Sequence, residues 1–170
     1  MGDRGLTAGR VIGIVAICLM LFGYLTPFRF HSGTTYWGLF NTCDNAGESL
    51  SCSFFTANYL KQVMTDSPED GVLLAVIGVG ILLTIVGVGG NFCGACDGRL
   101  SGLLCVAGGT AILLADFTGI VRTGFRINWD PTVFKAIWLG FGLEMLGGLL
   151  AIISGVLLLK TKENQISSID

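Results

Sequence analysis

The 170-residue chain carries too few charges for a water-facing surface. Charged residues make up 13% of it and hydrophobic residues 52%, whereas a soluble domain typically carries about 25% charged residues. The 26 glycines also favour a membrane protein, because glycine is more frequent in membrane helices than in soluble ones. The formal net charge of −2 provides no basic surface for nucleic acid, so a nucleic-acid-binding protein is not expected.

Four stretches are long and apolar enough to cross a bilayer, which takes about 20 mostly apolar residues. They cover residues 11–27, 71–90, 100–121 and 133–159. Each is expected to be helical, because an isolated strand in lipid would leave its backbone groups without hydrogen bonds. Loops at 28–70, 91–99 and 122–132 connect them, so the sequence predicts one membrane domain over residues 1–170.

The first span has one alternative, a cleaved signal peptide, because Arg4 and Arg10 precede its apolar run. The run is longer than a usual signal core, and no small-x-small cleavage site follows it before Pro27. We therefore expect the span to be retained. N-myristoylation is not expected either, since Leu6 stands where Ser or Thr is required.

Residues 33–56 have the pattern of a β-hairpin, with two arms rich in Thr, aromatic and apolar residues around a turn of Asp, Asn and Gly. Cys43 and Cys52 fall on opposite arms, so a disulfide between them would staple the hairpin. Closing so short a loop stabilises it by about 2–3 kcal/mol. Residues 57–66 then have the apolar spacing of a short helix.

Basic residues do not orient the chain in the membrane, because five lie on each side of the predicted topology. One side holds Arg4, Arg10, Arg99, Lys160 and Lys162, and the other holds Arg29, Lys61, Arg122, Arg126 and Lys135. The cysteine pair supplies the better argument, since a disulfide persists in the extracellular or lumenal compartment. We therefore expect loops 28–70 and 122–132 outside the cell and both termini in the cytosol.

The run Trp37-Gly38-Leu39-Phe40, followed by Cys43 and Cys52, resembles the W-G-L-W-C-C signature of the claudin superfamily. That superfamily includes the claudins, the peripheral myelin and epithelial membrane proteins, the lens fibre membrane intrinsic protein and the stargazin-like channel subunits. Residues 124–129 and 138–141 resemble its second extracellular segment and fourth helix. The resemblance implies a left-handed bundle of four transmembrane helices capped by a small extracellular β-sheet, with Trp37 buried between them.

Two departures from the claudin pattern bear on partners. Claudins carry an Arg between the second Cys and the second span, where this chain has only Lys61. Their tails end in a short apolar-terminated motif that docks PDZ scaffolds, whereas this chain ends at Asp170. Binding to the usual junctional PDZ scaffolds is therefore not expected.

Three ionisable residues fall inside the predicted spans: Asp116, Lys135 and Glu144. A carboxylate at the centre of a membrane helix costs roughly 2.5–3.5 kcal/mol, so such residues usually face the bundle and pair. We predict an Asp116–Lys135 pair, with an ion or proton path as the alternative. Glu144 has no obvious basic partner, and we expect it to be hydrogen-bonded to a neighbouring helix in its neutral form.

Small residues recur at every fourth position of two spans, which places them on one helix face. The third span has Ala107, Ala111, Ala115 and Gly119, and the fourth has Gly147, Ala151 and Gly155. We expect both sets to pack the chain's own helices together, with an oligomer interface as the alternative.

Cys93 and Cys96 follow the second span directly on the expected cytosolic side, where S-palmitoylation is plausible and unmodified thiols are the alternative. One C-x-x-C pair is too small for a four-ligand zinc site, and His31 is the sole histidine. No G-x-S-x-G motif is present. The sequence therefore predicts no metal, no cofactor and no enzymatic activity.

The resemblance implies a plasma-membrane protein of cell–cell contacts, assembling with like protomers side by side and across to the next cell. If it lines a pore, the first loop favours cations, because five acids (Asp44, Glu48, Asp66, Glu69 and Asp70) outnumber Arg29 and Lys61. An auxiliary subunit that regulates an ion channel is the second hypothesis. A tetraspan of membrane packing, as in myelin or lens, is the third.

Overall fold

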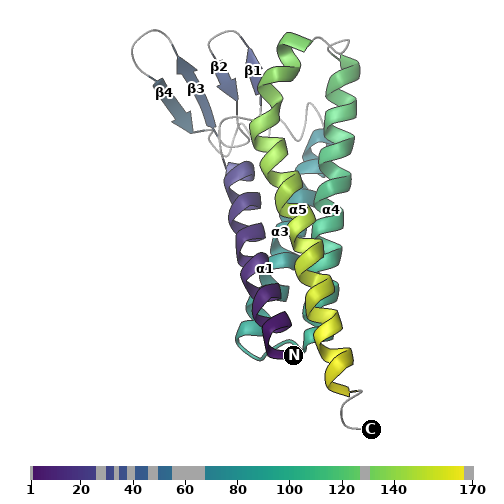
Figure 1. The fold of residues 1–170 in the computed structure, drawn as a ribbon. Helices are drawn as coiled ribbons and strands as arrows, with labels where there is room; N and C mark the ends of the chain where they lie inside the picture. The colour runs from purple at the N-terminus through teal and green to yellow at the C-terminus, as the bar shows by residue number, and fades with distance from the viewer. Residues whose placement is uncertain are drawn as a thin grey trace.

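Four long helices run side by side as a bundle, with a small sheet at one end (Figure 1). The computed structural model describes the backbone of residues 2–25, 30–32, 35–37, 41–45, 50–54, 68–126 and 131–166, and the side chains of residues 5–25, 69, 71–122 and 140–160. The helices are α1 (Gly2–Leu25), α3 (Pro68–Phe92), α4 (Gly98–Arg126) and α5 (Pro131–Ile166).

All four helices contain an apolar stretch long enough to cross a membrane. These stretches are Gly5–Leu25, Gly71–Phe92, Gly98–Arg122 and Gly140–Lys160. The prediction of a membrane protein with four apolar helices is confirmed at this level. Helices α3, α4 and α5 extend beyond both ends of the predicted spans, whereas α1 begins nine residues before its predicted span and ends at Leu25. Pro68 and Pro131 begin α3 and α5, positions at which proline sacrifices no helical hydrogen bond.

The outer surface of the bundle is apolar, which is the reverse of a soluble protein. Val72, Leu82 and Leu114 are each more than 60% exposed, and large aliphatic or aromatic side chains are exposed on all four helices. Contiguous exposed apolar surface of this extent marks a protein or membrane contact. Because it surrounds the described part of the bundle, the natural surroundings of these helices are lipid.

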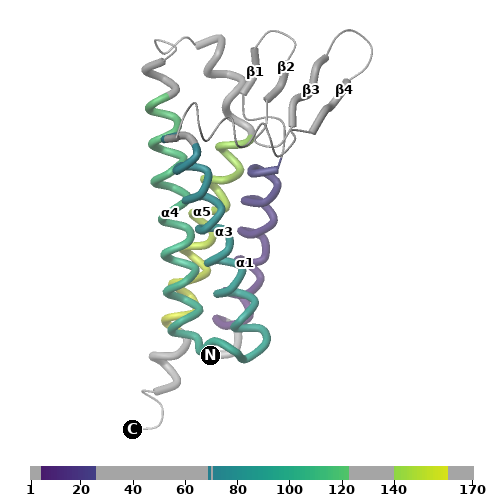
Figure 2. The backbone as a smooth tube through the Cα atoms, turned by 180° about the vertical axis from the view of Figure 1, so that it is seen from behind, coloured from purple at the N-terminus to yellow at the C-terminus, as the bar shows by residue number. Residues whose placement is uncertain are grey.

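Helix α5 packs against α1 on one side and α4 on the other, and α3 packs against α4. Helices α1 and α3 contact each other less extensively, and α3 passes behind α5 in the first view (Figures 1 and 2). Helix α1 begins and α5 ends at the same end of the bundle, which we call the terminal end (Figure 1). The turn between α3 and α4 lies there too.

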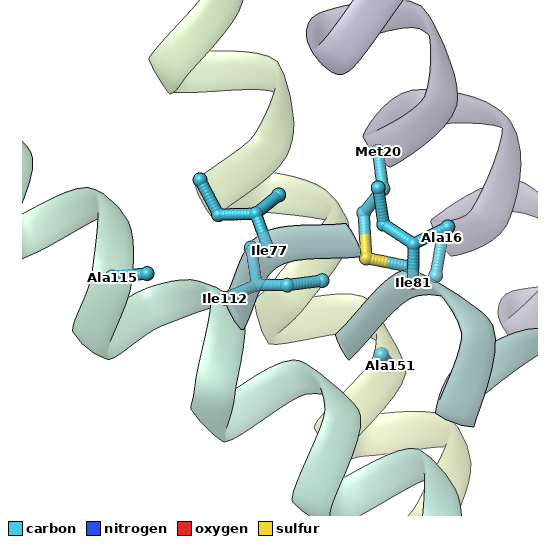
Figure 3. Packing of buried hydrophobic residues seen from close by; sticks show 7 residues of the cluster. All are labelled: Ala16, Met20, Ile77, Ile81, Ile112, Ala115 and Ala151. Carbon is cyan, nitrogen blue, oxygen red and sulfur yellow. The ribbon is translucent and has the colours of Figure 1, made fainter. Parts of the chain in front are cut away.

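Side chains from all four helices meet in the middle of the bundle (Figure 3). The cluster consists of Ala16 and Met20 of α1, Ile77 and Ile81 of α3, Ile112 and Ala115 of α4, and Ala151 of α5. A second cluster of Val88, Cys105 and Leu158 lies nearer the terminal end. Alanines on α1, α4 and α5 alternate with the longer side chains of Met20, Ile77, Ile81 and Ile112, so apolar side chains of different size fill this part of the interior.

Glycines set the spacing of the helices. A Cβ on Gly108 of α4 would lie 2.5 Å from the carbonyl oxygen of Gly80 on α3. A Cβ on Gly109 would lie 2.4 Å from the carbonyl oxygen of Gly148 on α5, on the neighbouring face of the same helix. Backbones that approach this closely pack by van der Waals contact, which is how helices associate in lipid.

The prediction for the small residues is right for α5 and only partly right for α4. Gly147, Ala151 and Gly155 are all buried. In α4, however, Ala107 is exposed, Ala111 and Gly119 are half-buried, and Ala115 is buried. A step of four residues advances about 40° around a helix of 3.6 residues per turn, so a set spanning twelve residues rotates out of any one interface.

Four strands form an antiparallel sheet in the order β1-β2-β3-β4. They are β1 (Phe30–Ser32), β2 (Thr35–Trp37), β3 (Asn41–Asn45) and β4 (Leu50–Phe54). The sheet lies at the bundle end opposite the terminal end, with β1 beside α5 (Figure 1). The predicted helix at 57–66 and residues 127–129, which belong to the part that resembles the second extracellular segment, lie outside the described residues.

Candidate functional site

The sheet brings together residues that the sequence singles out. Cys43 on β3 is the register partner of Cys52 on β4. Opposed residues of antiparallel strands have Cα atoms about 4.5–5.5 Å apart, which lies within the range of about 4.4–6.8 Å that disulfides span. The backbone is therefore compatible with the predicted disulfide, and the bond itself stays a prediction because these side chains are outside the described set.

Backbone register also places two further predicted residues on the sheet. Trp37 closes β2, opposite Phe30 of β1 and Thr42 of β3. Asp44 lies on β3, between Thr35 and Ser51. Gly38, Leu39, Phe40, Glu48 and Asp66 lie outside the described residues. Asp70 and Lys135 are placed on α3 and α5 by their backbone alone.

Glu69 is held by a basic residue that the sequence analysis did not connect with it. Arg122, near the end of α4, forms an ion pair with Glu69 in the first turn of α3. Glu69 is 70% exposed and Arg122 26% exposed, so water screens much of the attraction. The pair closes the sheet end of the α3–α4 interface. Residues 53 positions apart give no local sequence pattern, so only the antiparallel packing of α3 and α4 brings them together.

Asp116 and Glu144 are fully buried in the bundle, as their positions inside apolar spans predict. Both residues take part in interactions within the protein. Glu144 packs against α1, where a Cβ on Gly23 would lie 2.7 Å from its Cγ. The predicted Asp116–Lys135 pair falls outside the described residues, because the side chain of Lys135 is not among them. Among the described side chains, no group of three or more His, Cys, Asp or Glu residues forms a metal site.

The turn after α3 holds both cysteines of the C-x-x-C pair. Cys93 is exposed and Cys96 half-buried, and both are free thiols. The amide of Cys93 donates to the Gly89 carbonyl, and the amide of Cys96 to the Gly90 carbonyl, both at 3.0 Å. Gly94 has a φ of 70°, a left-handed conformation that glycine adopts without strain. The exposed thiol of Cys93 at a membrane boundary is compatible with the predicted acylation.

Arg10 makes a contact that was not predicted from the sequence. Its Nε donates to Asn91 Oδ1 at 2.7 Å, and its Nη2 donates to the Asn91 carbonyl at 3.0 Å. The guanidinium carbon lies 5.0 Å from the centroid of the Phe92 ring. A cation there also complements the negative end of the helix dipole of α3. Two features of the sequence could have indicated this contact: Arg10 directly precedes the first predicted span, and the polar Asn91 directly follows the second.

No protein-family model and no curated protein matches this chain. The resemblance to the claudin superfamily therefore rests on the motif between Trp37 and Cys52 and on the residues near the fourth helix.

Proposed function

We propose that this protein is a claudin-like plasma-membrane protein of cell–cell contacts that acts through its β-sheet on the extracellular side. One observation carries the proposal. Strands β2, β3 and β4, which carry Trp37, Cys43 and Cys52, form an antiparallel sheet at the bundle end opposite the termini, with Cys43 and Cys52 in register. That placement supports a claudin-like bundle whose sheet projects from the membrane.

The position of the sheet suits an adhesive surface. It grows from one long connection between α1 and α3, and β1 lies beside α5, so the bundle holds it at two places. A disulfide between β3 and β4 would stiffen the part farthest from the bundle. Such a surface reaches like protomers in the same membrane and in the next cell, and we propose both as partners.

For a pore lined by this loop we propose cation preference, carried by Asp44, Glu48, Asp66 and Asp70. Glu69 contributes less than its charge suggests, because Arg122 pairs with it. Without Glu69 in the count, the first loop has four acids against Arg29 and Lys61, which is a net charge of −2. Rings of acidic side chains favour cations. Dilution potentials across a monolayer expressing the protein measure this directly, and a preference for chloride would contradict it.

Localisation in a mixed culture tests the adhesive role. A tagged full-length chain is expressed in some cells and not in their neighbours. We expect it to concentrate where two expressing cells meet and to stay diffuse where an expressing cell meets a non-expressing one. Uniform staining at both kinds of contact would reject adhesion, and co-purification with an ion channel would then favour the auxiliary-subunit hypothesis.

Two cysteine variants test whether the predicted disulfide is needed for adhesion, one as the test and one as its matched control. Cys43→Ser is expected to abolish the enrichment, since the β3–β4 hairpin loses its staple. Cys18→Ser makes the same chemical change on the exposed face of α1 and is expected to leave the enrichment unchanged. If both variants concentrate equally at contacts between expressing cells, the disulfide is not needed for adhesion.

A further inference from the structure

Two basic residues stand at the same boundary of the apolar helices. Arg99 is the second residue of the apolar stretch Gly98–Arg122, and Lys160 is the last residue of Gly140–Lys160. Both side chains are exposed, at the terminal end of the bundle. A charge that close to the end of a membrane helix extends towards the level of the lipid headgroups.

Helix packing puts these two residues beside each other. A Cβ on Gly102, one turn after Arg99, would lie 2.6 Å from Leu159 Cγ, and Lys160 follows Leu159 directly. Val106, on the same face as Arg99, packs on α5: a Cβ on Gly155 would lie 2.7 Å from Val106 Cγ2. Arg99 and Lys160 therefore flank the line where α4 meets α5.

Below the two cations, the outer side of the α4–α5 contact is apolar. On α4, Leu103 is 53% exposed, and the exposed Thr110 uses its hydroxyl within its own helix, donating to the Val106 carbonyl at 2.8 Å. On α5, Val156 and Leu149 are 40% and 49% exposed. We define the outer α4–α5 strip as Arg99, Leu103, Thr110, Leu149, Val156 and Lys160.

No described acid neutralises the cations of this strip. Asp97 is the nearest described carboxylate in the chain, and its Oδ1 accepts a hydrogen bond from the amide of Leu100 at 2.8 Å, which caps α4. The only described ion pair, Glu69–Arg122, is at the other end of the bundle. The strip thus combines two positive charges, which no acid among the described side chains pairs with, and an apolar surface running towards the middle of the membrane.

We propose that the outer α4–α5 strip binds an anionic phospholipid of the leaflet at the terminal end. Its headgroup lies between Arg99 and Lys160, and one acyl chain lies along Leu103, Val156 and Leu149. Basic sites between membrane helices at this level select anionic headgroups, and each Lys or Arg near an anionic surface contributes about 1 kcal/mol, or about fivefold in affinity. A zwitterionic lipid gains much less from the same two charges.

Titration of the purified full-length protein in detergent tests the proposal, with bound lipid counted by native mass spectrometry. The probes are phosphatidylserine and phosphatidylcholine with identical acyl chains. We expect phosphatidylserine to bind the unaltered protein more tightly. Arg99→Gln and Lys160→Gln should each weaken phosphatidylserine binding about fivefold, and neither should change phosphatidylcholine binding. Both side chains are exposed, so neither substitution disturbs the interior.

Arg122→Gln is the control, because it removes one positive charge at the sheet end of the bundle. It should leave phosphatidylserine binding unchanged. Equal binding of the two lipids by the unaltered protein would overturn the proposal. An equal loss in Arg122→Gln and the two strip variants would also overturn it, since net charge and not this site would then govern binding. Circular dichroism of each variant establishes that its helices are intact.

Discussion

At the scale of single residues, the absence of a side chain is as consequential as any contact. Gly23 gives room to the buried Glu144, and Gly108 lets the backbones of α3 and α4 touch. Neither position carries chemistry, yet each decides whether two helices reach their packing distance. Glycine weakens a helix by about 1 kcal/mol relative to alanine, and a close helix contact compensates for that cost.

Gly108→Ala should destabilise the folded bundle by roughly 1–3 kcal/mol, the usual cost of overpacking. The added methyl would lie 2.5 Å from the Gly80 carbonyl oxygen and 2.5 Å from Thr84 Oγ1. Backbone cannot give way as a flexible side chain can, so α3 and α4 must separate. Thermal unfolding in detergent, followed by the loss of monodisperse protein, measures the change.

Gly142→Ala is the matched control for that experiment. It makes the same substitution in a helix, at a position on α5 where an added Cβ meets nothing within 4 Å. Helix propensity alone then applies, and stability should stay the same or rise slightly. A similar loss in both variants would mean that glycine flexibility, and not helix spacing, is the property that matters.

At the scale of whole elements, polar contacts in the terminal half of the bundle fix the helices relative to one another. Asp97 caps the start of α4, Arg10 of α1 binds the last turn of α3, and Ser154 Oγ of α5 donates to the Gly9 carbonyl of α1 at 2.7 Å. Apolar packing in lipid defines poorly how far one helix is shifted along its neighbour, because every turn is similarly apolar. The directional hydrogen bonds define that shift instead.

Arg10→Lys should loosen the α1–α3 contact nearly as much as Arg10→Ala. A lysine keeps the charge but loses the planar fork that reaches both Asn91 Oδ1 and the Asn91 carbonyl. Hydrogen bonds to charged groups contribute about 1.5–3 kcal/mol. Hydrogen exchange of the amides of Cys93 and Cys96 should therefore accelerate.

Arg99→Lys controls for charge and side-chain length at the same end of the bundle. Arg99 is exposed and makes no hydrogen bond among the described residues, so the exchange rates of the α3–α4 turn should be unchanged. Unaltered exchange in Arg10→Lys would show that charge alone holds α1 to α3.

The Glu69–Arg122 pair ties the start of α3 to the end of α4, and reversing its charges tests it. Arg122→Glu should reduce stability by up to about 1 kcal/mol, because it sets two carboxylates against each other at an exposed site. Adding Glu69→Arg should restore most of the loss. Thermal unfolding of the two single variants and the double variant at low salt gives the coupling, and purely additive effects would contradict the pairing.

At the scale of the whole molecule, the fold separates its two ends. The start of α1, the end of α5, the thiol of Cys93 and the basic residues of the outer α4–α5 strip all lie at the terminal end. The opposite end carries the sheet and the Glu69–Arg122 pair. The proposed adhesive role requires the sheet to be outside the cell, which in turn requires Cys93 to be inside.

Labelling of Cys93 with a membrane-impermeant maleimide tests this orientation. In intact cells Cys93 should remain unlabelled. After permeabilisation and treatment with hydroxylamine, which cleaves any thioester-linked acyl group, it should react, because its side chain is exposed at the terminal end. Cys105 is fully buried and should react only after denaturation, which controls for loss of structure. Peptide mapping assigns the label to each cysteine, and reaction of Cys93 in intact cells would reverse the proposed topology.

Much of the architecture could be predicted from the chain itself, for a physical reason. An apolar run of the right length has no stable state in lipid other than a helix, so the four helices follow from composition along the chain. The burial of Asp116 and Glu144 follows as well, because lipid excludes their carboxyls from the outer face. The exposure of Ala107 could not be predicted, because small residues suit both packed and lipid-facing positions.

The sequence by itself determined that the chain is a membrane protein with four apolar helices, since hydrophobic length and backbone hydrogen bonding are local properties. Only the tertiary structure decided which distant residues meet: Arg10 with Asn91, Glu69 with Arg122, and Gly80 with Gly108. It also placed Arg99 of α4 and Lys160 of α5 at the same end of the bundle, on either side of the α4–α5 contact. These contacts depend on the rotation and relative height of each helix, and packing against all its neighbours at once sets both.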